Sequence, residues 1–230
     1  MDVTAIILHY WRERTPHIAR IVSDLQKGSA KPAKIIIFNN NPKVVLPQLS
    51  GAITINSGYN FGCLVRHAIG LLSGTSHCLF IDDDMSVQPD ALASFIGYQN
   101  ANPNTVLGFF GKMLGDNAKQ PYTPGKNLRD VSKPTEVDLV LGRVHFCATT
   151  KLVNSFVLMN RVPAPWLETA TDDLLLSFAN RIIDKGKNII LPSKAMELGE
   201  KGVGCNFQGR HYPLRDECCR RVLAQYKGFG

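Results

Sequence analysis

The sequence contains no long hydrophobic run, which argues against a membrane-spanning helix. No apolar stretch of its 230 residues reaches the roughly 18 that such a helix needs. The N-terminus, "MDVTAIILHYWRERTP", has neither a basic leader nor a cleavage site of small residues, so it does not resemble a secretory signal. We therefore expect a cytoplasmic protein, with a Golgi or ER lumenal domain cut from a longer protein as the alternative.

Paired-cysteine motifs are also missing. None of the six cysteines shows a CxxC spacing, so no zinc site is expected from them. Three cysteines lie in apolar stretches and are expected in the core. Reduced thiols are expected in the cytoplasm, while a bridge from Cys205 to Cys218 or Cys219 stays open for a lumenal domain.

The formal net charge of +7 is spread along the chain, with one denser stretch, "GRHYPLRDECCRR", near the C-terminus. A nucleic-acid-binding protein would be expected to concentrate its charge in a stripe or tail, so no nucleic acid is expected as a partner. The basic stretch favours a phosphorylated substrate, with peripheral contact to an anionic membrane surface or plain solubility as alternatives.

Alternating strands and helices predict an α/β fold. Apolar, β-branched runs predict strands, and helical spacing with Pro or Gly at the ends predicts helices. The strands are expected over residues 3–11, 33–42, 51–57, 77–84, 104–114, 136–149 and 188–192. The helices are expected over residues 16–28, 62–75, 88–103, 171–186 and 219–226, with a further helix from 150. This order indicates a mostly parallel central sheet flanked by helices.

We expect a single domain over residues 1–230, in which 1–114 binds a nucleotide and 115–230 binds an acceptor. Residues 115–135 are polar and contain three prolines, which predicts a long functional or mobile loop. Ligands of parallel sheets bind beyond the carboxyl ends of the strands. Three polar strand ends, at residues 9–14, 39–41 and 82–84, are therefore expected to converge on one crevice.

Three consecutive carboxylates, Asp82, Asp83 and Asp84, close the apolar run in "HCLFIDDDM". Side chains alternate along a strand, so Asp82 and Asp84 should face one way and Asp83 the other. Two neighbouring carboxylates suit Mg²⁺ or Mn²⁺, which bind oxygen ligands and often carry substrate phosphates. The alternative is an acidic cluster at the start of the helix at 88.

This motif resembles the metal motif of GT-A fold glycosyltransferases, in the form seen in exostosin-like transferases. "NSGYNFGCLVRHAIGLLSGT" resembles the family's helix before that motif, with Asn60 and Arg66 at the matching places. Three later stretches are similar to the acceptor-side strand, the Asp-Asp helix start and the C-terminal segment. They are "VDLVLGRVHFCATTKLV", "TDDLLLSFANR" and "RHYPLRDECCRRVLAQYKGF".

The resemblance implies a nucleotide-sugar donor, a UDP-sugar, bound with Mn²⁺ or Mg²⁺, and transfer to a hydroxyl of a glycan or other acceptor with retention of configuration. It places Asp84 on the metal with Asp82, which would also contact the ribose or base. Asp83 would contact the ribose or the sugar.

Six further residues are predicted to bind the donor, of which Asn60 would hold the ribose or phosphate and the other five each have a structural alternative. They are Tyr10, Arg14, Asn39, Asn40, Asn60 and Arg66. The tyrosine could stack on uracil or pack at its strand end. The two adjacent asparagines could pair with the base edge or form Asx-turns beside Pro42. The arginines could reach the base, ribose or phosphates, or be exposed helix residues.

A second carboxylate pair, Asp172 and Asp173, opens a later helix. Both could serve only the helix dipole. The functional interpretation is that Asp173 reaches the acceptor or the transferred sugar, as a base in an inverting enzyme or as a stabilising charge in a retaining one. Arg215 would neutralise the departing diphosphate. His211 is a weaker metal-ligand candidate, and His145 is either near the acceptor or an ordinary strand histidine.

Three other functions fit parts of the sequence. A haloacid-dehalogenase-type phosphatase also uses Asp-x-Asp after a strand, but normally after the first strand, and Ser86 takes its last position. A nucleotidyltransferase would have a Gly-rich loop where this chain has "HYWRERTP". A non-catalytic sugar- or partner-binding module would not need the second acidic pair, whose presence favours an enzyme.

Overall fold

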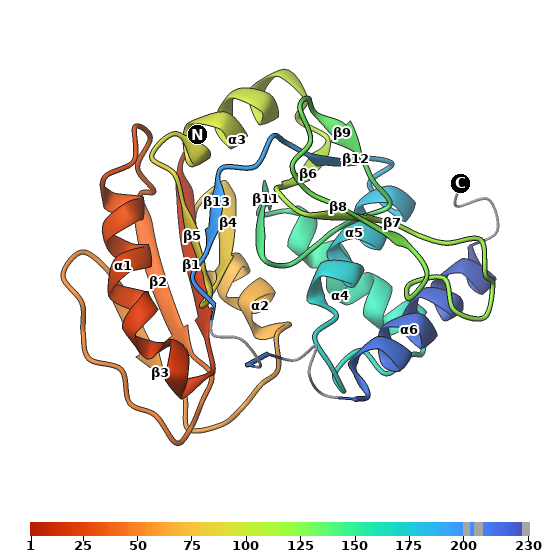
Figure 1. Cartoon of the computed structure of the whole chain (residues 1–230), viewed down its shortest axis with the longest axis horizontal. Coiled ribbons are helices and arrows are strands. Elements are labelled where there is room, and N and C mark those ends of the chain that lie inside the picture. The colour runs from red at the N-terminus through yellow and green to blue at the C-terminus, as the bar shows by residue number, and fades with distance from the viewer. Residues whose placement is uncertain (200–202, 205–208, 227–230) are drawn as a thin grey trace.

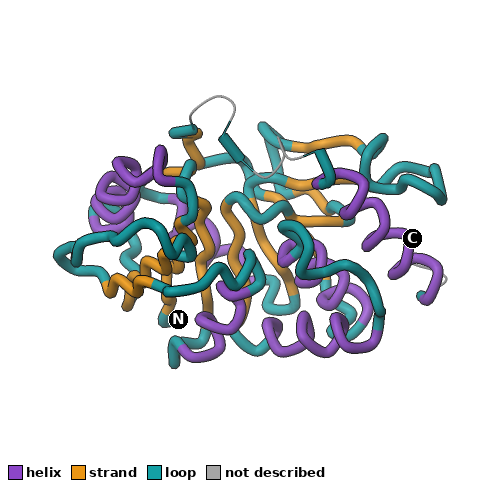
Figure 2. The backbone as a smooth tube through the Cα atoms, turned by 90° about the horizontal axis from the view of Figure 1, so that it is seen from below, coloured by secondary structure: helices purple, strands orange, loops and turns teal. Residues whose placement is uncertain are grey.

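The computed structural model describes residues 1–199, 203–204 and 209–226. Within these residues the central element is an eight-stranded sheet with the order β3-β2-β1-β4-β11-β6-β12-β9. Its strands are β1 (Val3–His9), β2 (Lys34–Asn39), β3 (Ile53–Asn56), β4 (His77–Asp82), β6 (Thr105–Gly108), β9 (Thr135–Glu136), β11 (Val144–Ala148) and β12 (Lys187–Ile190). Both halves of the sequence contribute strands, which run through the middle of the molecule (Figure 1 and Figure 2).

The direction of the strands decides which loops meet at the carboxyl edge. β3, β2, β1 and β4 are parallel neighbours, and β12 is parallel to β6. β11 runs antiparallel between β4 and β6. Because β11 is reversed, the residues that enter it lie beside the end of β4, where the N–H of Asp82 donates to the carbonyl of Arg143 at 2.9 Å.

Helices cover both faces of the sheet because its strands are apolar on both sides. The helices are α1 (Thr15–Gln26), α2 (Val65–Leu72), α3 (Ala91–Ala101), α4 (Lys151–Arg161), α5 (Asp172–Ile182) and α6 (His211–Gln225), with a 3₁₀ turn η1 (Arg12–Arg14). One core cluster joins α1 and α3 to the sheet, and a second joins α2, α4 and α5 to the opposite face. Among the described residues, no helix is both long and apolar enough to span a bilayer.

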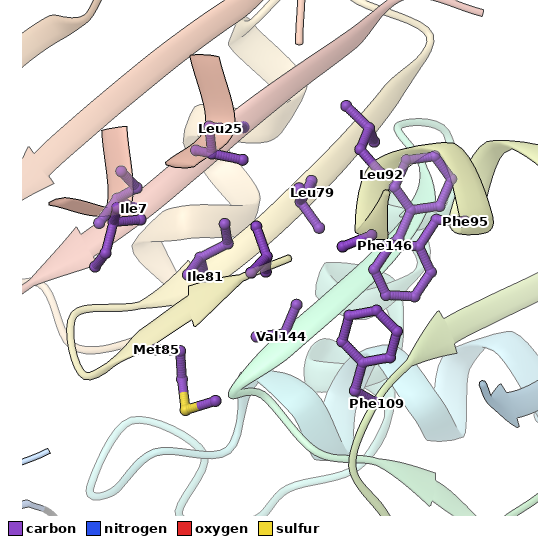
Figure 3. Close-up of a cluster of buried hydrophobic side chains, with 14 of the residues drawn as sticks. Ile7, Leu25, Leu79, Ile81, Met85, Leu92, Phe95, Phe109, Val144 and Phe146 are labelled. Carbon is purple, nitrogen blue, oxygen red and sulfur yellow. The ribbon is translucent and has the colours of Figure 1, made fainter. Parts of the chain in front are cut away.

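Alternation along the strands sorts side chains between these two clusters. In β1, Ile7 belongs to the α1–α3 cluster and its neighbour Ile6 to the other. Figure 3 shows the first cluster, where Phe95 of α3 stacks on Phe146 and Phe109 with ring centroids 5.5 and 4.5 Å away. Burying each such side chain contributes on the order of 1.5–3 kcal/mol, so the core fixes the edge on which the polar strand ends lie.

Two small sheets differ from the sequence-based expectation. The predicted strand 104–114 splits into β6 and β7 (Gly111–Met113), which pairs with β8 (Lys126–Leu128) and β10 (Leu139–Val140). β5 (Met85–Val87) pairs with β13 (Ala195–Glu197). The chain leaves the main sheet at Phe109 and Phe110, which are both buried. The predicted loop 115–135 therefore contains strand structure.

The C-terminal helix is also longer than predicted. It begins at His211 rather than at residue 219. Pro213 lies in its first turn, where the missing N–H is tolerated. The polar residues around this proline conceal the helix start in the sequence.

Candidate active site

The carboxyl edge of the sheet borders a cleft of about 810 Å³. That volume suits a small-molecule ligand, since such sites usually measure about 300–1,000 Å³. Eleven of the twelve predicted site residues line it: Tyr10, Arg14, Asn40, Asn60, Arg66, Asp82, Asp83, Asp84, Asp172, Asp173 and Arg215. Residues from both halves of the sequence thus meet in one cavity.

The three consecutive aspartates separate into two environments. β4 ends at Asp82, and Asp83 and Asp84 form the turn into β5. The side chains of Asp82 and Asp84 are 31% and 17% exposed, whereas that of Asp83 is only 4% exposed. Two carboxylates therefore remain accessible from the cleft, and the middle one belongs to the protein interior.

Four neighbouring groups engage the carboxylate of Asp83, whose predicted contact with the ribose or sugar stays a prediction. It pairs with His9 Nδ1 at 3.1 Å and Arg14 Nη1 at 2.8 Å. It also accepts hydrogen bonds from the backbone N–H groups of Tyr10 and Trp11. Burial alone would raise the pKa of Asp83, but these bonds outweigh it and hold the pKa below its ordinary value. Asp83 therefore anchors the loop after β1.

The pKa values of Asp82 and Asp84 are shifted in the opposite direction to that of Asp83. Burial raises the pKa of both carboxyl groups. Arg66 lowers the pKa of Asp82 and Arg14 lowers that of Asp84, but neither arginine cancels the effect of burial. Arg14 reaches Asp84 at 3.0 Å while it also binds Asp83. The negative charge at this turn is thus incompletely balanced by protein groups, which is what a cation site requires.

Arg66 connects the two acidic clusters. Its guanidinium lies 2.8 Å from Asp82 Oδ1 and 2.7 Å from Asp172 Oδ2, and it donates to the carbonyl of Gly142 at 3.0 Å. Only 3% of its side chain is exposed. The exposed-helix alternative is therefore wrong for Arg66. Its Nη1 and Nε are thus engaged by protein groups on both sides of the cleft, and its predicted contact with the ribose or phosphate stays a prediction.

Asp173 and Arg215 form a buried bidentate pair. Arg215 Nη1 and Nη2 lie 3.0 and 2.8 Å from the two oxygens of Asp173, which also accepts the N–H of Gly142. Burial would raise the pKa of Asp173, but Arg215 outweighs it and lowers that pKa. Burial raises the pKa of Asp172 despite the nearby Arg66. The two adjacent aspartates thus differ, and Asp173 remains ionised but is a weak base.

The asparagines after β2 mainly shape the loops. Asn39 does not line the cleft: it is fully buried and donates to Asn56 Oδ1 at 2.9 Å. Its own Oδ1 accepts the N–H of Asn41, which is the Asx-turn alternative. Asn40 lines the cleft, but its amide donates to Asn60 Oδ1 and to the carbonyl of Gly62.

Tyr10 and Asn60 are the more accessible of the predicted donor-binding residues. Tyr10 is half-buried and packs edge-on against Trp11, with centroids 5.2 Å apart. Asn60 is exposed on the loop between β3 and α2. Both line the cleft at the end that β1 and β2 form, so a planar base could contact them there.

The two candidate histidines have different positions. His145 is buried in β11, stacks on Phe80 with centroids 4.6 Å apart, and does not line the cleft. His145 is therefore not exposed on the acceptor side of the cleft. His211 lines the cleft beside Arg215, and its Nδ1 lies 2.9 Å from Thr169 Oγ1. Burial and that arginine lower the pKa of His211 to about 4.

Sequence reasoning missed several groups that hold the site together. His9 supports Asp83, and the backbone of Gly142 binds both Arg66 and Asp173. Tyr122, from the predicted loop 115–135, lies under the guanidinium of Arg215 at 4.4 Å from its ring centroid. A lone aromatic within an otherwise polar stretch is the sequence signal that could have marked Tyr122.

The cysteines contribute no bridge within the described residues. Five of them, Cys63, Cys78, Cys147, Cys218 and Cys219, form no disulfide with one another. Cys205 lies outside the described residues, so the bridge considered for it stays a prediction.

Comparisons with known proteins identify the fold that carries this cleft. No family model and no curated protein matches the sequence. Among solved structures, the chain is similar to GalNAc-T7 determined with UDP, GalNAc and Mn²⁺, with a TM-score of 0.63. The chain has the GT-A fold. The predicted fold class, a mostly parallel sheet flanked by helices, is thus confirmed.

The similarity to GalNAc-T7 lies in the fold and hardly at all in the sequence. The identity is 9%, and the match covers 86% of this chain but 44% of the GalNAc-T7 chain. The chain therefore spans less than half the length of that solved structure. Membership of the exostosin-like family stays a prediction.

Proposed function

We propose that this protein is a metal-dependent glycosyltransferase that moves a sugar from a UDP-sugar donor to a hydroxyl of a glycan or other acceptor. One observation carries the proposal. Two accessible carboxylates, Asp82 and Asp84, share a single cleft of a GT-A fold with the buried pair of Asp173 and Arg215. The first group suits a cation with a diphosphate, and the second suits the reacting sugar.

The donor would bind in the half of the cleft formed by residues 1–114. Tyr10 and Asn60 are accessible there to contact the base and ribose. Arg14 is held between Asp83 and Asp84 and orders the turn that carries the metal ligands. The acceptor would bind against residues 115–230, where Tyr212 and Leu167 line the cleft with 44% and 66% exposure.

Asp84 and Asp82 would hold the cation. Their donor set is carboxylate oxygen, which fits Mn²⁺ or Mg²⁺ better than softer metals. Their incompletely balanced charge also fits a cation. Bound there, the metal would supply positive charge to the departing diphosphate.

Asp173 would stabilise positive charge on the transferred sugar rather than remove a proton. Arg215 and the N–H of Gly142 occupy its oxygens and keep it ionised. A carboxylate whose pKa is lowered in this way is a poor general base. This favours a retaining reaction, in which an oxocarbenium-like sugar needs an adjacent negative charge.

The first test is ligand-dependent thermal stability with nucleotides and nucleotide sugars, with and without Mn²⁺. A ligand that binds the native state raises the unfolding midpoint with its concentration relative to Kd. We expect a rise with UDP or a UDP-sugar that depends on Mn²⁺. A rise only with Mg²⁺ and a phosphate mimic such as tungstate would instead favour the phosphatase. Donor binding without transfer would favour the non-catalytic module.

Asp84→Asn provides the variant that tests the metal assignment. We expect it to abolish the Mn²⁺-dependent shift and to lower turnover by about 10² or more, the effect of losing one key electrostatic group. Asp90→Asn is the matched control, because Asp90 is an exposed acid that pairs with Lys194 outside the cleft. Near-normal turnover of Asp84→Asn with metal present would exclude the assignment.

A further inference from the structure

A second cluster of metal-binding side chains lies beneath the cleft, apart from the accessible carboxylates. His67 comes from α2, His145 from β11 and Asp172 from the first turn of α5. All three are buried, with exposures of 0%, 1% and 1%. One ligand atom from each lies within 4.8 Å of the others. Three elements distant in the sequence thus bring two imidazoles and a carboxylate together.

The histidines are unusual because their ring nitrogens have no protein partners. Within the part of the chain that the structure describes, both nitrogens of His67 and Nε2 of His145 find no hydrogen-bond partner. Leaving a buried polar atom unsatisfied costs on the order of 1–3 kcal/mol. Each of the two histidines thus has a buried nitrogen without a partner, which is what an unfilled ligand position would leave.

His145 makes a hydrogen bond of the kind that metal-binding histidines commonly make. Its Nδ1 lies 3.2 Å from the carbonyl oxygen of Gly142, which can only accept a hydrogen bond. Nδ1 therefore carries the proton, which leaves the lone pair of Nε2 without a partner among the described residues. Metal-binding histidines are commonly fixed by this same bond from the second ring nitrogen to a backbone carbonyl.

Charge around the cluster is compatible with a cation. Three buried or half-buried carboxylates, Asp82, Asp172 and Asp173, face two guanidinium groups, Arg66 and Arg215. This network carries one excess negative charge when all five groups are ionised. Arg66 lies 2.7 Å from Asp172 and opposes a cation there, so the two neutral imidazoles must supply much of the affinity.

We infer that His67, His145 and Asp172 form a second cation site, which binds a borderline transition metal of the Zn²⁺ type beneath the cleft floor. Imidazole nitrogen with one carboxylate is a zinc donor set, whereas Mg²⁺ and Mn²⁺ prefer the oxygens of Asp82 and Asp84. Zinc ligands in a tetrahedron lie about 3.4 Å apart, so the three atoms would draw together by at most about 1.5 Å. Asp172 lines the cleft and gives the ion a route of entry.

Metal content in the Asp84→Asn background tests this site separately from the proposed function. The full chain is stripped with a chelator, dialysed against Zn²⁺ and then against buffer, and its zinc is measured by elemental analysis. We expect about one zinc per chain, as for a structural site of this donor set. X-ray absorption should show two imidazole ligands and no sulfur. A chain that retains no zinc overturns the inference.

Two further variants keep the test specific. His145→Gln in the same background should lose the zinc and the imidazole signal. His77→Gln is the matched control, because His77 stacks on Phe146 of β11 outside the cluster and should leave zinc binding unchanged. Retention of zinc by His145→Gln overturns the site. If His145→Gln does not fold, the X-ray absorption spectrum of zinc-loaded Asp84→Asn decides alone. Zinc bound without imidazole ligands would then contradict the proposed site.

Discussion

At the scale of single residues, the cleft depends on charges that are buried in pairs. Arg215 and Asp173 are 3% and 7% exposed at the side chain, and each supplies most of the compensation for the other. A buried ion pair adds little net stability, but removing one partner leaves an uncompensated charge in a poorly hydrated site. From the sequence alone, Arg215→Ala would be expected to weaken donor binding more than folding; the burial indicates a large effect on folding.

Arg215→Met should therefore lower the free energy of unfolding by about 3–5 kcal/mol, measured by urea denaturation. The double variant Arg215→Met/Asp173→Asn should recover a substantial part of that loss, because neither charge remains. Arg210→Met, in an exposed pair with Glu168, is the matched control and should change stability by less than about 1 kcal/mol. If the double variant loses as much stability as the two single substitutions added together, the two side chains do not interact.

The sequence predicted which residues line the cleft better than it predicted the contacts that those residues make. Asp82 ends the apolar strand β4 and Asp84 lies in the turn after it, so their location could be derived from the point where the apolar run stops. That Asp83 is consumed by His9 and Arg14 could not, because it depends on the path of the loop after β1. Asn39 is a case where local turn chemistry, visible beside Pro42, was the better interpretation.

At the scale of elements, close packing between helices and sheet fixes the position of α2, which carries Arg66 and His67. A Cβ on Gly70 of this helix would lie 2.5 Å from Leu152 Cδ1 and 3.2 Å from Cys78 Sγ. α3 offers the opposite case, since a Cβ on Gly97 would meet nothing within 4 Å. The two glycines thus serve different purposes within similar helices.

Gly70→Ala should destabilise the protein by about 1–3 kcal/mol because it overpacks the contact between α2 and α4. Gly97→Ala, at an exposed helix position, should stabilise it by about 0.5–1 kcal/mol through the higher helix propensity of alanine. Thermal denaturation of both variants measures the difference. Equal shifts in the same direction would show that packing at Gly70 is not tight.

Element types followed from the sequence where the pattern was long and periodic, as for α1, α5 and the strands of the main sheet. The break between β6 and β7 was missed, because "VLGFFGKM" is apolar almost throughout and its two strands join different sheets. β5 and β13 were missed because each has three residues and is defined only by its partner. Such elements depend on contacts distant in the sequence.

At the scale of the whole molecule, burial keeps His211 neutral in the native state. Burial and Arg215 lower the pKa of His211 to about 4, below its ordinary value of 6.5. The unfolded chain therefore binds a proton here before the native state does. Stability from this residue is present above the unfolded pKa and is lost as the pH falls from about 6.5 toward 4.

His211→Gln should therefore reduce the acid sensitivity of the protein. Between pH 7 and pH 4.5 we expect the free energy of unfolding of the wild type to fall by on the order of 1–2 kcal/mol more than that of the variant. Urea denaturation at a series of pH values gives this difference. His17→Gln is the comparison at a less buried histidine. Parallel pH profiles for wild type and His211→Gln would contradict the prediction.

The overall architecture was predictable because alternating strands and helices leave few topologies. The reversed β11 was not specified by that pattern, although it decides that residues 141–143 border the cleft. The strand β6, from the first half of the chain, also lies between β11 and β12 of the second half. The proposed division into donor and acceptor halves is thus a division of the cleft and not of the sheet.

Arg66 holds Asp82 with one guanidinium nitrogen and Asp172 with another, and this shared contact has a thermodynamic consequence. A cation bound to Asp82 would weaken the ion pair between Asp82 and Arg66. The positive charge of Arg66 would then act mainly on Asp172. The two sides of the cleft then have a coupling free energy. By linkage, a ligand at one of the two proposed subsites would change the affinity at the other by the same factor that it experiences in return. Occupancy of the two would then be correlated without any movement of the backbone.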